Sequence, residues 1–246
     1  SGKAERLGRV ADGNTVCDFD PEEIRRKASV STAILPLEWK ETKINLLDTP
    51  GLFDFAGGLR EGIRAAGSAV IVLSGKSGLT VGAAKGYDAA RRKGIATLFF
   101  INKMDNPHAD FFKVFAQLRD AYGSKICPIV IPQVVDHEVK CYINLLENKA
   151  YTYNANGVAT EVEVPALGGI YDEMRQAVYE AVAETSEELM EKYFSGEEFT
   201  PDELIKGIAT GVRRGEIAPV FCGSAQELEA IDQLLTGLLW LAPWAE

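Results

Sequence analysis

Continuous hydrophobic runs alternate with amphipathic stretches along the first half of the chain. Residues 69–73 and 98–101 are uninterrupted apolar runs, which are typical of strands buried on both faces of a parallel sheet. The stretches at 82–93 and 108–122 place apolar residues at helical spacing, and a further apolar run follows at 126–131. Strands that alternate with helices predict an α/β fold built on a doubly wound, mostly parallel sheet.

The segment before this alternation predicts a short helix and a hairpin. Residues 21–27 begin with proline and acids and end with bases, as a short helix prefers. The runs at 29–39 and 43–47 are rich in β-branched and apolar residues, and a turn between them would make a hairpin. Residues 52–67 have an amphipathic helical pattern with interior glycines, which cost about 1 kcal/mol each relative to alanine. We expect that segment to be mobile or remodelled by a ligand.

The pattern changes after residue 132. Three short runs joined by turns predict an antiparallel meander at 139–146, 150–153 and 158–164. Helical periodicity follows at 170–194, and Thr200-Pro201 marks the start of a helix that ends near Arg214. The chain then returns to a strand at 218–222 and a final amphipathic helix at 226–241.

These changes divide the chain into a host and an insertion. We expect an α/β host domain over 1–132 and 217–246, and an inserted α+β subdomain over 133–216. An insertion of about 80 residues holds only a small core of its own. It is therefore expected to pack on its host.

Small polar clusters follow three of the expected strands. They are Asp48-Thr49-Pro50-Gly51, Asn102-Lys103-Met104-Asp105 and Gly223-Ser224-Ala225. In open α/β sheets, ligands bind at the carboxyl ends of the strands. Each cluster alone also fits an ordinary turn, but their joint occurrence in this order indicates one ligand site.

The chemistry of the clusters suits a guanine nucleotide. The Asp105 carboxylate can accept hydrogen bonds from the ring donors of a purine, the Asn102 amide complements its carbonyl side, and the Lys103 stem can cover the ring. Asp48 can hold the water shell of a magnesium ion, and the amide of Gly51 can meet a terminal phosphate. The third cluster offers backbone amides, without a bulky side chain, to the guanine carbonyl.

Composition and charge exclude several other classes of protein. The chain is 46% hydrophobic, and its 26 basic and 36 acidic residues give a net charge of -10. An acidic surface repels polyanions, so we expect no direct nucleic-acid binding by this chain. The four cysteines lie far apart without a C-x-x-C pair, which indicates reduced thiols in a cytoplasmic protein. No apolar run approaches the ~20 residues of a membrane helix, and no secretory segment opens the chain, so no membrane partner is expected.

With these motifs in place, the sequence resembles the translational GTPases over nearly its whole length, and most closely elongation factor G and its relatives. The matching stretches are residues 8–20, DTPG at 48–51, NKMD at 102–105, ADFF at 109–112, SEELMEKY at 186–193 and GSA at 223–225. The resemblance implies a P-loop GTPase-like fold with an inserted subdomain, and GTP or GDP with Mg²⁺ as ligands. It also implies a cytoplasmic, ribosome-dependent GTPase that drives translocation.

The resemblance also implies residue roles. Asp105 and Asn102 would read guanine, Lys103 would cover the ring, and Ser224 and Ala225 would close the base site. The same motifs imply further nucleotide contacts at Asp48, Thr49, Pro50, Gly51, Met104 and Gly223. Mg²⁺ contacts are implied at Ser29 and Asp48.

The family's phosphate-binding loop, G-x-x-x-x-G-K-[ST], is missing from this sequence. The Gly2-Lys3 pair does not supply it, because Ala4 stands where the magnesium-binding hydroxyl belongs. We expect the loop upstream of Ser1 and take the chain to be a fragment. Without that loop, this chain alone is expected to bind GTP poorly and to be inactive.

Two further positions depart from the family pattern. Leu52 stands where the family has the histidine that positions the attacking water, so no catalytic residue is assigned. Ser29 aligns with the first-switch threonine that contacts magnesium, and Lys27 replaces the neighbouring glycine. Two alternatives therefore stay open: a divergent paralogue that binds GTP or the ribosome with little turnover, and a ribosome-protection factor of the tetracycline-resistance type.

Overall fold

Parallel strands form the central sheet of the computed structural model, which describes residues 8–166 and 168–243. The sheet has the order β3 (Ser68–Ser74), β4 (Ala96–Asn102), β10 (Ala218–Cys222) and β5 (Ile126–Pro128). All three pairings are parallel. The Gly2-Lys3 pair, which we excluded as a phosphate-binding loop, lies outside the described residues.

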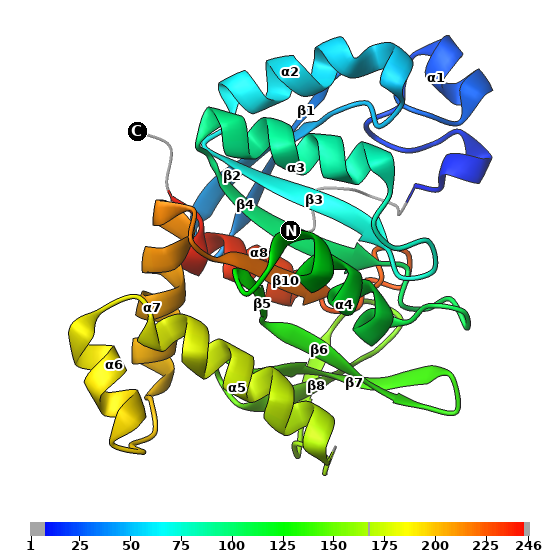
Figure 1. The fold of residues 1–246 in the computed structure, drawn as a ribbon. Helices are drawn as coiled ribbons and strands as arrows, with labels where there is room; N and C mark the ends of the chain where they lie inside the picture. Colours follow the sequence, from blue (N-terminus) through cyan, green and yellow to red (C-terminus); the bar gives the residue numbers. More distant parts are fainter. Residues whose placement is uncertain (1–7, 167, 244–246) are drawn as a thin grey trace.

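Helices cover both faces of this sheet (Figure 1). On one face, Phe99 of β4 lies 4.9 Å, between ring centroids, from Tyr87 of α3 (Val81–Lys93). Tyr122 of α4 (Phe111–Tyr122) packs on the same pair of rings. On the other face, Phe221 of β10 lies against Gly237 of α8 (Ile231–Leu241), where an added Cβ would come within 2.3 Å of the ring. The predicted α/β class and parallel sheet are confirmed.

Burial distinguishes the inner strand β4 from the edge strand β3. Leu98 through Ile101 are at most 3% exposed, as the continuous apolar run predicted. Val72 of β3 is 58% exposed, so the prediction that β3 is buried on both faces is wrong. The reason is position, because β3 pairs only with β4 among the described strands.

The predicted hairpin forms, but as a sheet of its own. β1 (Ala33–Trp39) and β2 (Thr42–Asp48) pair antiparallel, and both turn residues, Lys40 and Glu41, have positive φ. This is the turn geometry that matches strand twist in two-residue hairpins. Burial alternates along β1, and every residue of β2 is half-buried or exposed, so the prediction of a buried strand before Asp48 is wrong. Trp39 Nε1 donates to Thr236 Oγ1 of α8 over 3.1 Å and holds the hairpin on the host.

Two short helical segments flank the hairpin. After η1 (Val10–Asp12), α1 (Pro21–Arg26) forms as predicted, with Asp20 and Glu23 making a capping box. After η2 (Phe53–Phe55), α2 (Ala56–Ala65) lies against residues 49–50. A Cβ on Gly62 would lie 2.5 Å from the Thr49 methyl group, so close packing requires that glycine. The expected mobility of this segment stays a prediction.

A second sheet, β6 (Val130–Val135), β7 (Glu138–Asn144), β8 (Lys149–Tyr153) and β9 (Ala159–Val162), is antiparallel in sequential order. The meander is confirmed, but the single strand predicted at 126–131 is wrong. The chain changes sheets at Ile129. Its N–H donates to Val220 O of the parallel sheet over 2.9 Å, and its carbonyl accepts from Leu145 N, which follows β7, over 2.9 Å.

The helices of the second half differ from prediction in their bounds. The single helix expected at 170–194 is two helices, α5 (Gly169–Ala183) and α6 (Glu187–Phe194), because Ser186 caps a new start through Leu189 N. α7 (Pro201–Arg214) begins at a Thr200 capping box, as predicted. α8 begins at Ile231 rather than at 226, because residues 224–230 form a loop.

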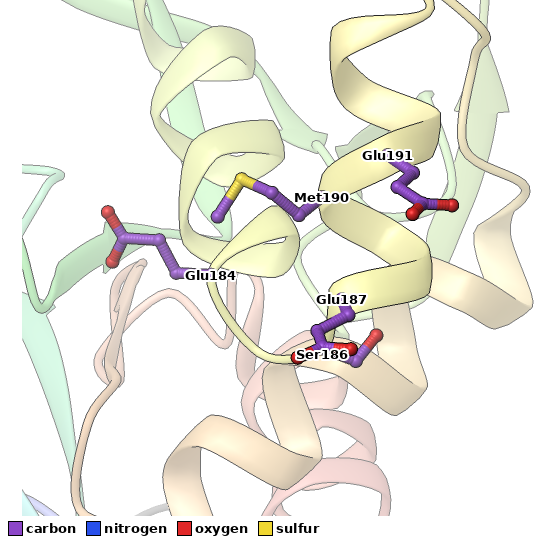
Figure 2. Close-up of a pocket in the computed structure, with 5 residues that line it drawn as sticks. All are labelled: Glu184, Ser186, Glu187, Met190 and Glu191. Carbon is purple, nitrogen blue, oxygen red and sulfur yellow. The ribbon is translucent and has the colours of Figure 1, made fainter.

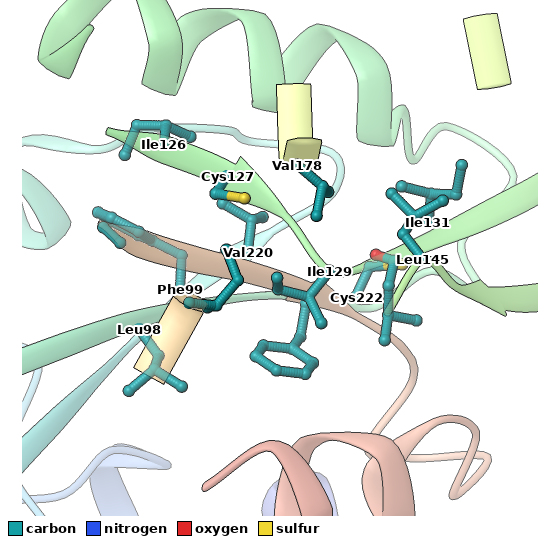
Figure 3. Packing of buried hydrophobic residues seen from close by; sticks show 14 of the residues in the cluster. Leu98, Phe99, Ile126, Cys127, Ile129, Ile131, Leu145, Val178, Val220 and Cys222 are labelled. Atoms are coloured by element: carbon teal, nitrogen blue, oxygen red, sulfur yellow. The ribbon is translucent and has the colours of Figure 1, made fainter. Parts of the chain in front are cut away.

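One hydrophobic cluster joins the two sheets. Val178 of α5 belongs to the same cluster as Ile129 and Val220 (Figure 3). The inserted segment therefore packs on the host, as its small size led us to expect. The division at residues 132 and 216 stays a prediction, with β6 running across its first boundary. Within residues 8–166 and 168–243, no helix is long and apolar enough to cross a membrane.

Candidate functional site

Parallel pairing of β4 with β10 brings two of the three polar clusters together. Ile101 aligns with Cys222, so the loops that follow them leave the sheet side by side. Met104 N donates to Gly223 O over 3.2 Å. Ala225 N donates to Asn102 Oδ1 over 2.9 Å, and Ser224 Oγ donates to Asp105 Oδ1 over 2.5 Å. Residues 102–105 and 223–225 thus form one hydrogen-bonded site.

Some polar atoms of this site make no hydrogen bond to the described part of the chain. Asn102 Oδ1 is occupied by Ala225 N and by Lys103 N, which leaves the amide N–H₂ without a partner in the described part of the chain. Asp105 is exposed, and Ser224 holds only one of its carboxylate oxygens. Lys103 has φ 64° and is exposed at the turn. The site therefore presents an amide donor and a carboxylate acceptor next to each other, which is the pattern that complements the edge of guanine.

The end of β3 supports this site from the side opposite β10. Gly75 N donates to Asn102 O over 2.8 Å, and Asp110 N donates to Gly75 O over 3.0 Å. A Cβ on Gly75 would lie 3.0 Å from the buried Met104 sulfur. Sequence reasoning missed Gly75, although a glycine directly after an expected strand was a signal for close approach.

Sequence reasoning also missed a hydrogen-bonded pair behind Ser224, the buried Tyr142 and the half-buried Glu229. Ser224 and Glu229 exchange two backbone hydrogen bonds of 3.0 and 2.9 Å, and Tyr142 OH donates to Glu229 Oε2 over 2.7 Å. The pKa of Glu229 is raised, chiefly by burial and also by the charge of Asp105. The hydrogen bond from Tyr142 offsets only part of this rise. Burial also raises the pKa of Tyr142. Tyr142 and Glu229 are 87 positions apart, and no local pattern links them.

The first cluster, Asp48 to Gly51, lies apart from this site at the end of β2. Asp48 is exposed and Pro50 is buried against α2. Across the described residues, no hydrogen bond joins 48–51 to 102–105 or to 223–225. The clusters therefore form a hydrogen-bonded pair and a separate loop.

The carboxylates of Asp48, Asp18 and Glu23 all act on the Cys17 thiol. Ser29 Oγ donates to Asp18 Oδ1 over 2.7 Å. The pKa of the Cys17 thiol is raised to about 12, first by burial, then by hydrogen bonding to Asp48 and by the charges of Asp48, Asp18 and Glu23. Asp48 and Asp18, the acceptor of the Ser29 hydroxyl, thus both act on the Cys17 thiol.

These residues fit a magnesium ion shared with a nucleotide. No group of three carboxylate, thiol or imidazole side chains gathers into a metal site in the ranges that the structure covers. Mg²⁺ commonly takes one or two protein oxygens and completes its shell with water and phosphate oxygens. Carboxylate and hydroxyl oxygens from Asp48 and Ser29 match that requirement.

Leu52 follows the first cluster and is 47% exposed. A leucine side chain neither donates nor accepts a hydrogen bond, so it cannot orient a water molecule. The position that the family resemblance marks for catalysis therefore carries no polar group.

A hollow at the junction of α5 and α6 has a different character (Figure 2). Its lining consists of Glu184, Ser186, Glu187, Met190 and Glu191. Three carboxylates without a basic side chain would repel nucleotide phosphates. The hollow is not a nucleotide site.

Comparison with known proteins agrees with this arrangement. The family model described as the elongation factor Tu GTP binding domain matches residues 1–243. The chain is also similar to a protein of Thermus thermophilus whose crystal structure is known, with a TM-score of 0.90 and 34% sequence identity. That likeness covers 98% of this chain and 36% of the Thermus chain, so this chain spans little more than a third of its length.

Proposed function

This chain belongs to the elongation factor Tu GTP-binding domain family, and we propose that it is the guanine-nucleotide-binding domain of an elongation-factor-G-like translational GTPase that acts on the ribosome in translocation. The observation that carries the proposal is the convergence of Asn102 and Asp105 with Ser224 and Ala225. The inserted antiparallel sheet supports the likeness to elongation factor G.

In the proposed base site, guanine lies against the loops after β4 and β10. Asp105 accepts from the ring N–H and the exocyclic amino group, and Asn102 donates from its free amide. The Lys103 stem covers the ring, and the backbone around Ser224 and Ala225 closes the site. Adenine carries an amino group where guanine has a carbonyl and lacks guanine's ring N–H, so its edge pairs poorly with this arrangement.

At the phosphate end of the proposed site, the residues of this chain position the ion and the phosphates and form no covalent bond with them. When bound, Mg²⁺ neutralises charge that develops on the phosphates. Asp48 and Ser29 would hold the ion, directly or through water, and the amide of Gly51 would meet the terminal phosphate. Thr49 and Pro50 anchor this loop against α2.

A second candidate function is favoured by Leu52. The chain would then belong to a paralogue that binds guanine nucleotide, or the ribosome, with little turnover. Orientation of the attacking water is a main part of GTPase catalysis, and leucine cannot provide it. Single-turnover GTP hydrolysis by the intact protein with ribosomes separates the two candidates, because rapid hydrolysis would eliminate the second.

Nucleotide competition in the intact protein tests the base site. We expect GDP to displace a fluorescent GDP analogue at concentrations at which ADP does not. Asp105→Asn should lower the affinity for GDP and raise the affinity for xanthosine diphosphate, because the new amide can donate to the additional xanthine carbonyl. Equal binding of GDP and ADP by the unaltered protein would overturn the proposal.

A further inference from the structure

Side chains of the antiparallel sheet hydrogen-bond to the segment that follows the base site. Tyr142 OH donates to Glu229 Oε2 over 2.7 Å, and Tyr153 OH donates to Asp232 Oδ1 over 2.7 Å. Asn144 Nδ2 donates to Gln233 Oε1 over 2.9 Å. These bonds tie strands β7 and β8 to the loop at residues 224–230 and to the first turn of α8.

Of these three bonds, the one from Tyr142 ends on a residue, Glu229, that also pairs with the base site. Glu229 exchanges two backbone hydrogen bonds with Ser224, and the Ser224 hydroxyl donates to Asp105. The same hydroxyl accepts from Glu227 N over 3.1 Å, which fixes its orientation. A short series of hydrogen bonds thus runs from the antiparallel sheet to Asp105.

The 224–230 loop needs outside support to hold its shape. Leu228 and Ala230 have φ values of 60° and 57°, a conformation that residues other than glycine seldom adopt unless neighbouring contacts impose it. One such contact comes from the β8–β9 turn, where a Cβ on Gly157 would lie 2.7 Å from Leu228 Cβ. The antiparallel sheet therefore braces the loop at both Glu229 and Leu228.

We propose that Tyr142 and Glu229 are positioning residues for guanine recognition. The Tyr142 hydroxyl holds the Glu229 carboxylate, and Glu229 fixes the backbone of Ser224, whose hydroxyl orients Asp105. The antiparallel sheet thereby controls how firmly the guanine edge is held and how long the nucleotide stays bound. This inference rests on the proposed function, in which Asp105 reads guanine.

Tyr142→Phe in the intact protein is the direct test. It removes one hydroxyl and keeps the ring that packs at 5.9 Å, between centroids, on Tyr153. We expect GDP to dissociate about tenfold faster, the change typical of losing one hydrogen bond to a charged group. Tyr151→Phe is the matched control, because Tyr151 lies opposite Tyr142 on β8 and makes no bond to the 224–230 loop among the described residues. Its GDP release should not change.

A second measurement distinguishes the positioning of Asp105 from a general loss of rigidity in the base site. Inosine diphosphate lacks the exocyclic amino group that Asp105 would accept from, so it depends less on the orientation of that carboxylate. Tyr142→Phe should therefore weaken GDP binding more than inosine diphosphate binding. An equal loss for both nucleotides would mean a merely structural role and would overturn the inference.

Variants at Glu229 keep the inference testable if Tyr142→Phe fails to fold. Glu229→Gln retains an oxygen that accepts from Tyr142, and GDP release should stay near the unaltered rate. Glu229→Ala removes that oxygen and should release GDP about tenfold faster. If the unaltered protein prefers GDP over ADP, but Glu229→Gln and Glu229→Ala release GDP at the same rate, the positioning role fails while the proposed function stands. Loss of the GDP preference in the unaltered protein overturns both.

Discussion

Asp105 has an exposed carboxylate whose orientation depends on one neighbouring hydroxyl. Ser224 is fully buried, and its Oγ donates to Asp105 Oδ1 over 2.5 Å. The same hydroxyl accepts from Glu227 N over 3.1 Å, and the backbone of Ser224 pairs with Glu229. A substitution that removes only the hydroxyl therefore releases the Asp105 carboxylate and one loop N–H, while the backbone pairing of Ser224 with Glu229 stays.

Ser224→Ala should raise the Kd for GDP by about tenfold, because Asp105, which we propose reads the base, loses the fixed orientation of its carboxylate. Titration calorimetry on the intact protein measures this change. Ser195→Ala is the control, because it also removes a hydroxyl, but one that bonds only within 192–197 on α6 and its end. Equal affinities of the two variants would show that Ser224 does not position Asp105.

The Cys17 thiol should be a poor nucleophile at neutral pH. Its pKa is raised to about 12, first by burial and then by the Asp48 carboxylate. The reactive thiolate is therefore scarce below that pH, and alkylation by iodoacetamide should speed up about tenfold for each added pH unit across the neutral range. Mass spectrometry of the Cys17 peptide gives the rate.

Asp48→Asn provides the comparison for Cys17. It removes the negative charge next to the thiol, so alkylation should become faster, while the larger contribution from burial persists. A rate at about pH 8 equal to that of an exposed cysteine would contradict the assignment, because an ordinary thiol is already partly ionised there. Urea-unfolded protein supplies that reference rate.

At the scale of elements, α1 fixes the loop that carries Ser29. Glu23 of α1 is 2% exposed, and its carboxylate accepts from Val30 N and Ser31 N over 3.0 Å each and from Asp20 N over 3.1 Å. These backbone bonds, those of Val30 and Ser31 first, lower the pKa of Glu23. One side chain therefore caps the helix and holds the candidate magnesium loop.

Glu23→Ala should lower the free energy of unfolding by about 1–3 kcal/mol, because three backbone N–H groups lose the charged acceptor that they share. The folded pKa lies below the unfolded one, so the contribution is complete above the unfolded pKa and is lost as pH falls through the folded pKa. The difference from the unaltered protein should therefore shrink in acid. Urea titrations at several pH values measure it.

The matched control for Glu23 lies on the same helix. Glu22 pairs with Arg25 and Arg26 on the exposed side of α1, and such surface pairs contribute little to stability. Glu22→Ala should therefore change the unfolding midpoint far less than Glu23→Ala. Equal shifts would show that the backbone hydrogen bonds of Glu23 contribute no more to stability than a surface ion pair.

How far the sequence predicted these elements depends on whether their causes are local. The apolar run of β4 was readable because burial on both faces removes periodicity. The break at Ile129 was not, because it arises from hydrogen bonds to Val220 and Leu145, which are distant in sequence. The new start at Ser186 did carry a local capping signal, which the continuous helical periodicity outweighed.

The same distinction applies to the candidate site. The meeting of Asn102 and Asp105 with Ser224 follows from the rule that parallel strands end at one edge. The hydrogen bond between Tyr142 and Glu229 depends on how the inserted sheet packs, and no sequence motif predicts that packing.

At the scale of the whole molecule, the parallel sheet and the antiparallel sheet share one core. Ile129 is 1% exposed and hydrogen-bonds to both sheets, and Val178 brings α5 into the same cluster (Figure 3). A contiguous core favours cooperative unfolding, because neither sheet can keep its buried surface without the other. The proposed base site follows β4 and β10 and is hydrogen-bonded to the antiparallel sheet through Tyr142 and Glu229, so its geometry depends on both parts.

Ile129→Ala should therefore destabilise both sheets together, by about 2–5 kcal/mol in the free energy of unfolding. Hydrogen exchange read by mass spectrometry should show equal losses of protection in peptides from β4 and from β7 and β8. Phe194→Ala, at a side chain 78% exposed on α6, should change neither. Faster exchange confined to the antiparallel sheet would show that the insertion unfolds independently, and the hydrogen bonds from Tyr142 to Asp105 would then cross a boundary between separate folding units.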